Sequence, residues 1–202
     1  MASRRGNVET EIKLRIEDPR PIRRALARLG FAAIGRRALE INEVFDTPAC
    51  HLRAAKKLLR LRSFRGRSVL TYKGPPAPGR HKSREELETE ISSLTTMHAV
   101  LERLGYTVAW RYQKYRTEFR GKRGGGHVMI DETPIGNFVE LEGPPQWIDR
   151  TARRLGFRPE DYITSSYGWL YLEFCKSRGI EPGHMVFAKA SRKSTSRSRR
   201  KK

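Results

Sequence analysis

The sequence is poor in cysteine and lacks the long apolar runs that define several protein classes. Cys50 and Cys175 lie far apart without the spacing of metal ligands, and we expect them to be free thiols in a reducing cytosol. No apolar run approaches the roughly 20 residues that a membrane-spanning helix needs. The first residues also lack the apolar stretch of a secretory signal. We therefore expect a cytoplasmic protein without a membrane-spanning segment.

Two further patterns are missing. The five histidines are scattered along the chain, which argues against a zinc site. There is no GxxxxGK[ST] loop to hold phosphates. The glycine run 124–126 lies between two strand-like segments, and this position indicates a hairpin turn, not a dinucleotide-binding loop.

Acidic residues are scarce relative to basic ones. The 202 residues contain 42 Lys and Arg against 22 Asp and Glu, which gives a formal charge of +20. Residues 189–202 carry eight of the basic groups and no acid, so the remainder has 34 bases, 22 acids and a charge of +12. The body is therefore basic without its tail, and an anionic partner or substrate is expected.

Charged and apolar residues alternate along several segments, as in β-strands with one apolar and one charged face. In 8–16, for example, Ile12 and Leu14 alternate with Glu11 and Lys13. Segments with apolar stripes at helical spacing separate these strands. The pattern predicts helices at 19–29, 97–104, 146–155 and 161–176, and strands at 8–16, 38–46, 58–64, 68–72, 83–91, 108–120, 127–131 and 137–142.

The apolar faces of strands and helices must cover one another, so the charged faces form the other side of the sheet. An open sheet would show this side to water, as charged strand faces commonly do. A sheet of eight strands can also close, and the charged side would then line a polar lumen. Patterning alone leaves both arrangements open. Trp110, Trp147 and Trp169 are expected in the core, and no residue is identified as a stacking platform for a base.

The charged face mixes many basic and many acidic side chains. Basic groups in one cavity repel one another unless a polyanion binds among them, and clustered carboxylates repel one another unless divalent cations neutralise them. Arg and Lys bind phosphate oxygens, whereas carboxylate oxygens bind Mg²⁺ or Mn²⁺. The combination predicts a site for a metal-bound polyphosphate.

Several motifs in this order resemble the CYTH superfamily, the triphosphate tunnel metalloenzymes, and its class IV adenylyl cyclase branch most of all. The first motif is ExExK, formed by Glu9, Glu11 and Lys13. The others are LRLR at 59–62, LTYKGP at 70–75, KYR at 114–116, VMIDETPIGNFVELEG at 128–143, and Ser166-Tyr167 at the start of the last helix.

This resemblance implies an α+β fold: an eight-stranded antiparallel β-barrel, or tunnel, with a polar lumen and helices packed outside. It implies Mg²⁺ or Mn²⁺ as cofactor and a triphosphate as substrate. The implied metal ligands are Glu9, Glu11, Glu140, Glu142 and Asp131. The implied substrate-binding residues are Lys13, Arg60, Arg62, Lys73, Arg84, Lys114 and Arg116. Glu86, Glu88 and Glu90 match the family more loosely, because these carboxylates share one face of one strand.

Two reactions fit such a tunnel, and the sequence assigns no catalytic residue to either. The resemblance favours cyclisation of ATP to cyclic AMP and pyrophosphate. The alternative is hydrolysis of inorganic, nucleoside or thiamine triphosphate. A hypothesis of another class is a non-catalytic polyphosphate or nucleic-acid binder.

The domain organisation follows from the same patterns. We expect a flexible N-terminus at 1–7, one tunnel domain at 8–176, and a basic extension at 177–202 that is disordered from about 189. The extension could contact nucleic acid or an acidic partner. The oligomeric state is left open, with a homodimer as one option.

Overall fold

The computed structural model describes residues 7–122 and 124–188. The predicted N-terminal segment 1–7 therefore falls outside it except for Asn7, which begins a strand, and the tail from 189 falls outside it entirely. In chain order the elements are β1 (Asn7–Ile16), α1 (Pro19–Arg28), β2 (Phe31–Ala33), β3 (Ala38–Asp46), α2 (His51–Ala54), β4 (Leu58–Phe64), β5 (Arg67–Lys73), β6 (Lys82–Ile91), α3 (Leu94–Arg103), β7 (Thr107–Gly121), β8 (His127–Thr133), β9 (Gly136–Glu142), α4 (Pro145–Arg154), a 3-10 turn (Pro159–Asp161) and α5 (Tyr167–Arg178).

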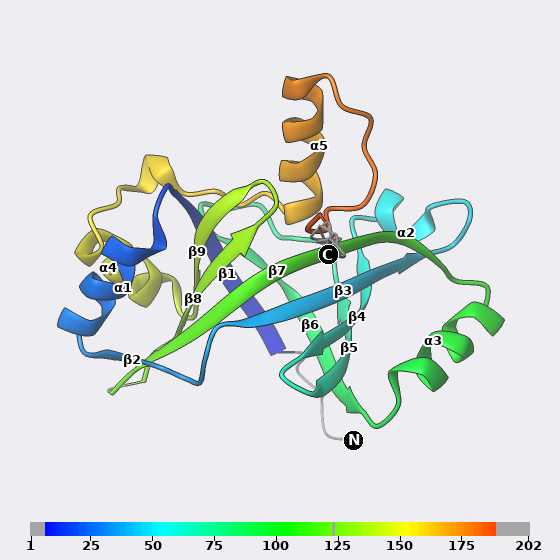
Figure 1. Cartoon of the computed structure of the whole chain (residues 1–202), viewed down its shortest axis with the longest axis horizontal. Coiled ribbons are helices and arrows are strands. Elements are labelled where there is room, and N and C mark those ends of the chain that lie inside the picture. Colours follow the sequence, from blue (N-terminus) through cyan, green and yellow to red (C-terminus); the bar gives the residue numbers. More distant parts are fainter. Residues whose placement is uncertain (1–6, 123, 189–202) are drawn as a thin grey trace, which may run out of the picture.

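The strands form one closed antiparallel sheet. Their order is β2-β7-β3-β4-β5-β6-β1-β9-β8, and a further pairing of β7 with β8 joins the two ends into an eight-stranded barrel. The short strand β2 remains outside the ring, paired to the far end of β7. The helices lie outside the barrel, and the fold is α+β as expected (Figure 1).

Local sequence explains where the helices begin. Asp18 caps α1 by accepting a hydrogen bond from the backbone NH of Arg20, and Pro19 occupies the first turn. Ser93 and Ser166 cap α3 and α5 in the same way. Within the described residues, no helix is long and apolar enough to span a membrane.

The apolar core lies between the barrel wall and the helices. Ile12 and Leu14 of β1 point outward and pack in one buried cluster with Leu26 of α1 and Ile148 of α4. Because strand side chains alternate, Glu11 and Lys13 of the same strand point into the barrel. The alternation predicted from the sequence thus places the apolar face under the helices and the charged face in the lumen.

The last helix differs from its prediction. The pattern at 161–176 predicts one continuous helix, but α5 begins only at Tyr167. The reason is that Ile163 pairs with Lys13 through two backbone hydrogen bonds of 2.9 Å, which hold the chain extended there. The segment after α5 also packs: Met185 is buried and hydrogen-bonds to the backbone of β7.

Candidate functional site: a charged barrel interior

The lumen is lined by eight basic and eight acidic side chains, and every one of the eight barrel strands contributes at least one of them. The basic residues are Lys13, Arg60, Arg62, Lys73, Lys82, Arg84, Lys114 and Arg116. The acidic residues are Glu9, Glu11, Glu40, Glu86, Glu88, Asp131, Glu140 and Glu142.

One end of the lumen is built around β1 and its neighbour β6. Lys73 Nζ lies 2.5 Å from Glu9 Oε2 and 2.9 Å from Glu86 Oε1. Glu11 Oε1 lies 3.0 Å from Lys13 Nζ and 2.9 Å from Lys82 Nζ. These side chains are at most 16% exposed, so the ion pairs are shielded from water.

The other end is organised by Asp131 of β8, whose side chain is completely buried. Its carboxylate accepts hydrogen bonds of 2.7 Å from Arg116, 2.8 Å from Lys114 and 2.8 Å from the Tyr167 hydroxyl. Glu140 also pairs with Arg116. Tyr167 reaches this carboxylate from α5, which stands over the barrel (Figure 1).

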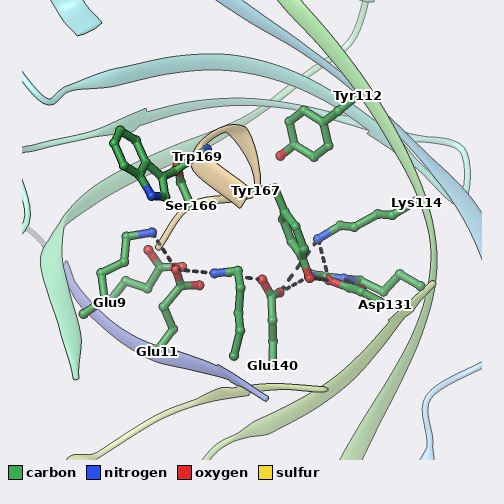
Figure 2. A network of polar contacts seen from close by, with 12 residues as sticks. Glu9, Glu11, Tyr112, Lys114, Asp131, Glu140, Ser166, Tyr167 and Trp169 are labelled. Atoms are coloured by element: carbon green, nitrogen blue, oxygen red, sulfur yellow. Dashed lines mark hydrogen bonds and ion pairs between the residues drawn. The ribbon is translucent and has the colours of Figure 1, made fainter. Parts of the chain in front are cut away.

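Lys13 connects the two ends. Its ammonium group lies 3.0 Å from Glu11 and 3.3 Å from Glu140, and Arg116 contacts both Glu140 and Asp131, so the contacts are continuous from Glu11 to Asp131 (Figure 2). The Tyr167 ring covers this connection, with its centroid 5.1 Å from Lys13 Nζ and 4.9 Å from Lys114 Nζ. Lys13 therefore links the carboxylate of Glu11 to the network around Asp131.

A third group lies on β4. Arg60 is buried and donates hydrogen bonds to the Tyr112 hydroxyl (3.1 Å) and to Thr71 (3.3 Å). Arg62, two residues along, is more exposed and contacts Glu88 at 3.2 Å. The two arginines thus share a face of the strand, as their spacing predicts, but only Arg60 is held deep in the barrel.

The structure brings together all the predicted site residues except Glu90. That side chain is 55% exposed and pairs with Arg67 at the end of its strand, away from the lumen network. Glu88 lies at the rim, 37% exposed. Glu85 is exposed, and Glu132 contacts Arg37 outside the barrel. Both lie away from the lumen, as expected because each is one residue away from a lumen-facing position on its strand.

Four lumen residues are missing from the site residues predicted from the sequence: Glu40, Lys82, Tyr112 and Tyr167. The alternation of residue types could have identified Glu40, because Glu40 and Asn42 alternate with Leu39 and Ile41 on β3. Lys82 was missed because β6 begins one residue earlier than predicted. Tyr167 belongs to the Ser166-Tyr167 motif, but the motif alone gives it no place in the lumen, and Tyr112 carries no sequence signal that separates it from core aromatics. Trp169, expected in the core, is 56% exposed, and Figure 2 shows its indole nitrogen turned toward the lumen.

Charge pairing decides the protonation of the buried acids. Burial alone would raise the pKa of Asp131, but Arg116 and Lys114 outweigh it and lower the pKa to about 2. Burial likewise opposes ionisation of Glu40, whose pKa Lys114 and Arg116 lower to about 2. Asp131 and Glu40 are therefore anions at neutral pH.

Lys82 shows the opposite balance. Burial lowers the pKa of its ammonium group to about 8, despite the attraction of Glu11.

Glu142 behaves differently from the other acids. It faces Glu11 across the β1–β9 pairing. Burial, with repulsion from Glu9, Glu86 and Glu11, raises the pKa of Glu142 to about 7. Burial and the repulsion among these carboxylates thus favour the protonated form of Glu142.

The donor set at this end suits a divalent cation. Mg²⁺ and Mn²⁺ prefer carboxylate oxygens, and Glu9, Glu11, Glu86 and Glu142 supply them together. Among the described residues, no three such side chains already converge in metal-ligand geometry. The reason lies in the ion pairs, since Lys73 and Lys82 occupy the carboxylates.

The basic side chains suit phosphate groups. Five of them, Lys13, Arg60, Lys73, Lys114 and Arg116, are at most 7% exposed. The Nε atoms of Arg60 and Arg84 are buried without a hydrogen-bond partner among the described residues. A buried donor without a partner is costly, and a phosphate oxygen would supply the missing acceptor.

The pKa of Glu142 predicts a pH-dependent stability. Between pH 4.5 and about 7 the folded protein holds a proton on Glu142 that the unfolded chain releases, so this group's contribution to stability is lost as pH rises. Glu142→Gln should therefore stabilise the metal-free protein at pH 8, by roughly 1 kcal/mol after screening by water, and have little effect at pH 4.5. Urea unfolding of both proteins at the two pH values measures this. An equal change in unfolding free energy at the two pH values would contradict the raised pKa of Glu142.

Comparisons with known proteins identify relatives along most of the chain. A family model described as the CYTH domain matches residues 7–167. The chain is 31% identical over 136 residues to a protein of Methanocaldococcus jannaschii named "putative adenylate cyclase", and the match covers 67% of this chain and 76% of that protein.

Solved structures show the same fold. A "putative adenylate cyclase" from Vibrio parahaemolyticus superposes with a TM-score of 0.73 at 22% identity, covering 85% of this chain and 99% of that one. A "putative adenylyl cyclase" from Hippeastrum, described as having a dominant triphosphatase activity, has a TM-score of 0.58 at 21% identity and covers 86% and 97%. At these identities the likeness concerns the fold alone.

Proposed function

Since this chain belongs to the CYTH domain family, we propose that it is a metal-dependent enzyme that converts ATP to cyclic AMP and pyrophosphate inside the barrel, in the manner of class IV adenylyl cyclases. The observation that carries the proposal is the lumen itself, in which buried lysines and arginines lie among buried carboxylates. The relative named "putative adenylate cyclase", at 31% identity, supports cyclisation over hydrolysis.

Binding would proceed by an exchange of partners. Phosphate oxygens replace carboxylates at Lys73, Lys13 and Arg116, and also satisfy the unpartnered Nε of Arg60. The carboxylates released, Glu9 and Glu11 among them, are then free to hold Mg²⁺ or Mn²⁺. Such an exchange gives the phosphates and the released carboxylates partners of opposite charge.

The chemistry then requires the ribose 3′-oxygen to attack the α-phosphorus in line. The P–O bond to the β-phosphate breaks, pyrophosphate leaves, and the 3′-hydroxyl releases its proton to water. The bound cation would supply charge neutralisation at the phosphate oxygens. The buried arginines and lysines fix the triphosphate chain and stabilise the charge that accumulates on the leaving pyrophosphate.

Product analysis tests this function. The full chain is incubated with Mg²⁺ or Mn²⁺ and, separately, with ATP, inorganic triphosphate or thiamine triphosphate. Cyclic AMP with pyrophosphate supports the cyclase. Diphosphate with phosphate would instead establish the triphosphatase alternative, and no turnover of any triphosphate would overturn an enzymatic role.

A matched pair of arginine variants tests how the substrate is held. Arg has a planar fork that binds two phosphate oxygens, whereas Lys is a point charge. Because Arg60 is buried and oriented by Tyr112 and Thr71, Arg60→Lys should lower kcat/KM about tenfold or more, or about 1.4 kcal/mol. Arg62→Lys, nearer the rim, should cost less. Steady-state kinetics give kcat/KM for both variants. Near-wild-type values for both would show that these arginines do not hold the substrate.

Trp169 supplies a test of substrate class. An exposed indole turned toward the lumen can stack on a nucleobase, which inorganic triphosphate lacks. Stacking contributes about 1–3 kcal/mol per base, so Trp169→Ala should raise the KM for ATP about tenfold and leave the KM for inorganic triphosphate unchanged. Equal KM changes for both substrates would show that Trp169 acts on the fold and not on the base.

A further inference from the structure

Helices α1 and α4 both pack on the outside of the barrel, away from the lumen. They lie side by side at one end of the molecule (Figure 1). Their inner sides share a buried cluster that includes Ile22 and Leu26 of α1 and Ile148 and Ala152 of α4. The positions of their outward-facing side chains are therefore fixed by a common core.

The outward side of this helix pair is strongly basic. The exposed residues of α1 are Arg20, Pro21, Arg24, Ala27 and Arg28, and those of α4 are Pro145, Gln146, Arg150, Arg153 and Arg154. None of them is acidic. Of the acids beside these helices, Asp18 pairs with Arg20, Asp149 with Arg80, and Glu132 with Arg23.

Five of these arginines have no acidic partner among the described residues, namely Arg24, Arg28, Arg150, Arg153 and Arg154. We call them the α1–α4 arginine face. A favourable interaction with the helix dipole accounts for those in the last turn of each helix, Arg28, Arg153 and Arg154. It does not account for Arg24 or Arg150. Like charges gathered on one rigid surface repel one another, and a bound polyanion would relieve that repulsion.

The composition of the face indicates the kind of polyanion. Guanidinium groups bind phosphate oxygens in pairs. Proteins that bind single strands add exposed aromatic side chains on which bases stack, and the exposed residues of α1 and α4 include none. Each helix has ten residues and is about 15 Å long, a length over which a duplex presents several phosphates.

We propose that the α1–α4 arginine face binds the phosphate backbone of a double-stranded nucleic acid without reading its sequence. The surface is separate from the charged lumen, so this binding and triphosphate turnover are independent properties of the chain. It also differs from the basic tail, because the arginines belong to the folded body.

Fluorescence anisotropy with a labelled 20-base-pair duplex tests the proposal. The full chain, tail included, is compared with the variant carrying Arg24→Gln, Arg28→Gln, Arg150→Gln, Arg153→Gln and Arg154→Gln. Each phosphate contact contributes about 0.9 to the slope of log K against log salt for DNA. The variant should lose roughly 3 to 4 from that slope and at least tenfold in affinity at about 100 mM salt, with triphosphate turnover unchanged.

Controls separate this face from charge in general. Five exposed basic residues elsewhere are changed to Gln in a matched variant: Arg53, Lys56, Lys57, Lys176 and Arg178. This control, and the five Arg→Lys changes on the face itself, should retain most of the binding. A variant limited to the three α4 arginines should lose part of the slope, and it replaces the fivefold variant if that one fails to fold.

Three results would overturn the proposal. The first is an unchanged slope in the fivefold variant, which would assign binding to the tail. The second is an equal loss in the matched control, which would reflect net charge alone. The third is tighter binding of a single-stranded oligonucleotide of the same length than of the duplex. DNA and RNA duplexes are measured in parallel, since both present the phosphate backbone.

Discussion

Glu9→Gln and Glu11→Gln are each expected to lower metal-dependent turnover by at least about 100-fold, or about 2.7 kcal/mol of transition-state stabilisation, while the barrel remains folded. Both carboxylates are buried at the end of the lumen where they and Glu86 repel Glu142. Gln keeps the shape and still accepts hydrogen bonds from Lys73 or Lys82, but it removes the negative charge that a divalent cation requires.

The measurement is kcat/KM at limiting and at saturating Mg²⁺ or Mn²⁺, with circular dichroism to verify the fold. The matched control is Glu90→Gln, which makes the same change on an exposed carboxylate bound only to Arg67. That variant should keep wild-type activity. Full activity of both lumen variants at limiting metal would exclude these carboxylates as metal ligands.

Much of the fold could be predicted from the alternation of residue types. The β1 sequence dictates that Ile12 and Leu14 share one face and Glu11 and Lys13 the other, and the structure confirms this. The motif order led to the family, which the match over residues 7–167 confirms. Closure of the sheet could not be deduced from patterning, because it depends on pairings between strands far apart in the chain, β3 with β7 and β1 with β9, and these strands show the same alternation in an open sheet.

The remaining differences have tertiary causes. The three residues of β2 carry no periodic pattern and form a strand because the end of β7 extends beyond β3. Tyr167 is a lumen residue only because α5 stands over the barrel, and the spacing of residues within α5 does not encode that position. Glu40 could have been predicted from the sequence, since a charged residue between Leu39 and Ile41 on a predicted strand belongs to the charged face that lines the lumen.

Asp131→Ala is expected to lower the free energy of unfolding by about 3–5 kcal/mol, because removing one partner of a buried ion pair leaves the other charges uncompensated. Asp131 is completely buried and accepts hydrogen bonds from Lys114, Arg116 and Tyr167. In the variant, Lys114 retains contacts of 3.5 Å or more with Glu40 and Glu140, and Tyr167 loses its acceptor.

The neighbouring residue provides the control. Glu132 lies next to Asp131 on β8 but points outward, where its partly exposed carboxylate contacts Arg23 and Arg37. Surface ion pairs contribute about 0–1 kcal/mol, so Glu132→Ala should change the unfolding free energy by less than about 1 kcal/mol. Urea unfolding of the three proteins gives both values, and a loss below 1 kcal/mol for Asp131→Ala would mean that the lumen network does not stabilise the metal-free fold.

The pH dependence identifies the charge as the cause. The pKa of Asp131 is lowered from 3.8 to about 2 in the folded protein, so its ion pairs contribute fully above pH 3.8 and their contribution is lost as pH falls toward 2. The difference between wild type and Asp131→Ala should thus be constant from pH 5 to 8 and shrink below about pH 3.8. A difference that persists unchanged at pH 2.5 would point instead to a cavity left by the missing side chain.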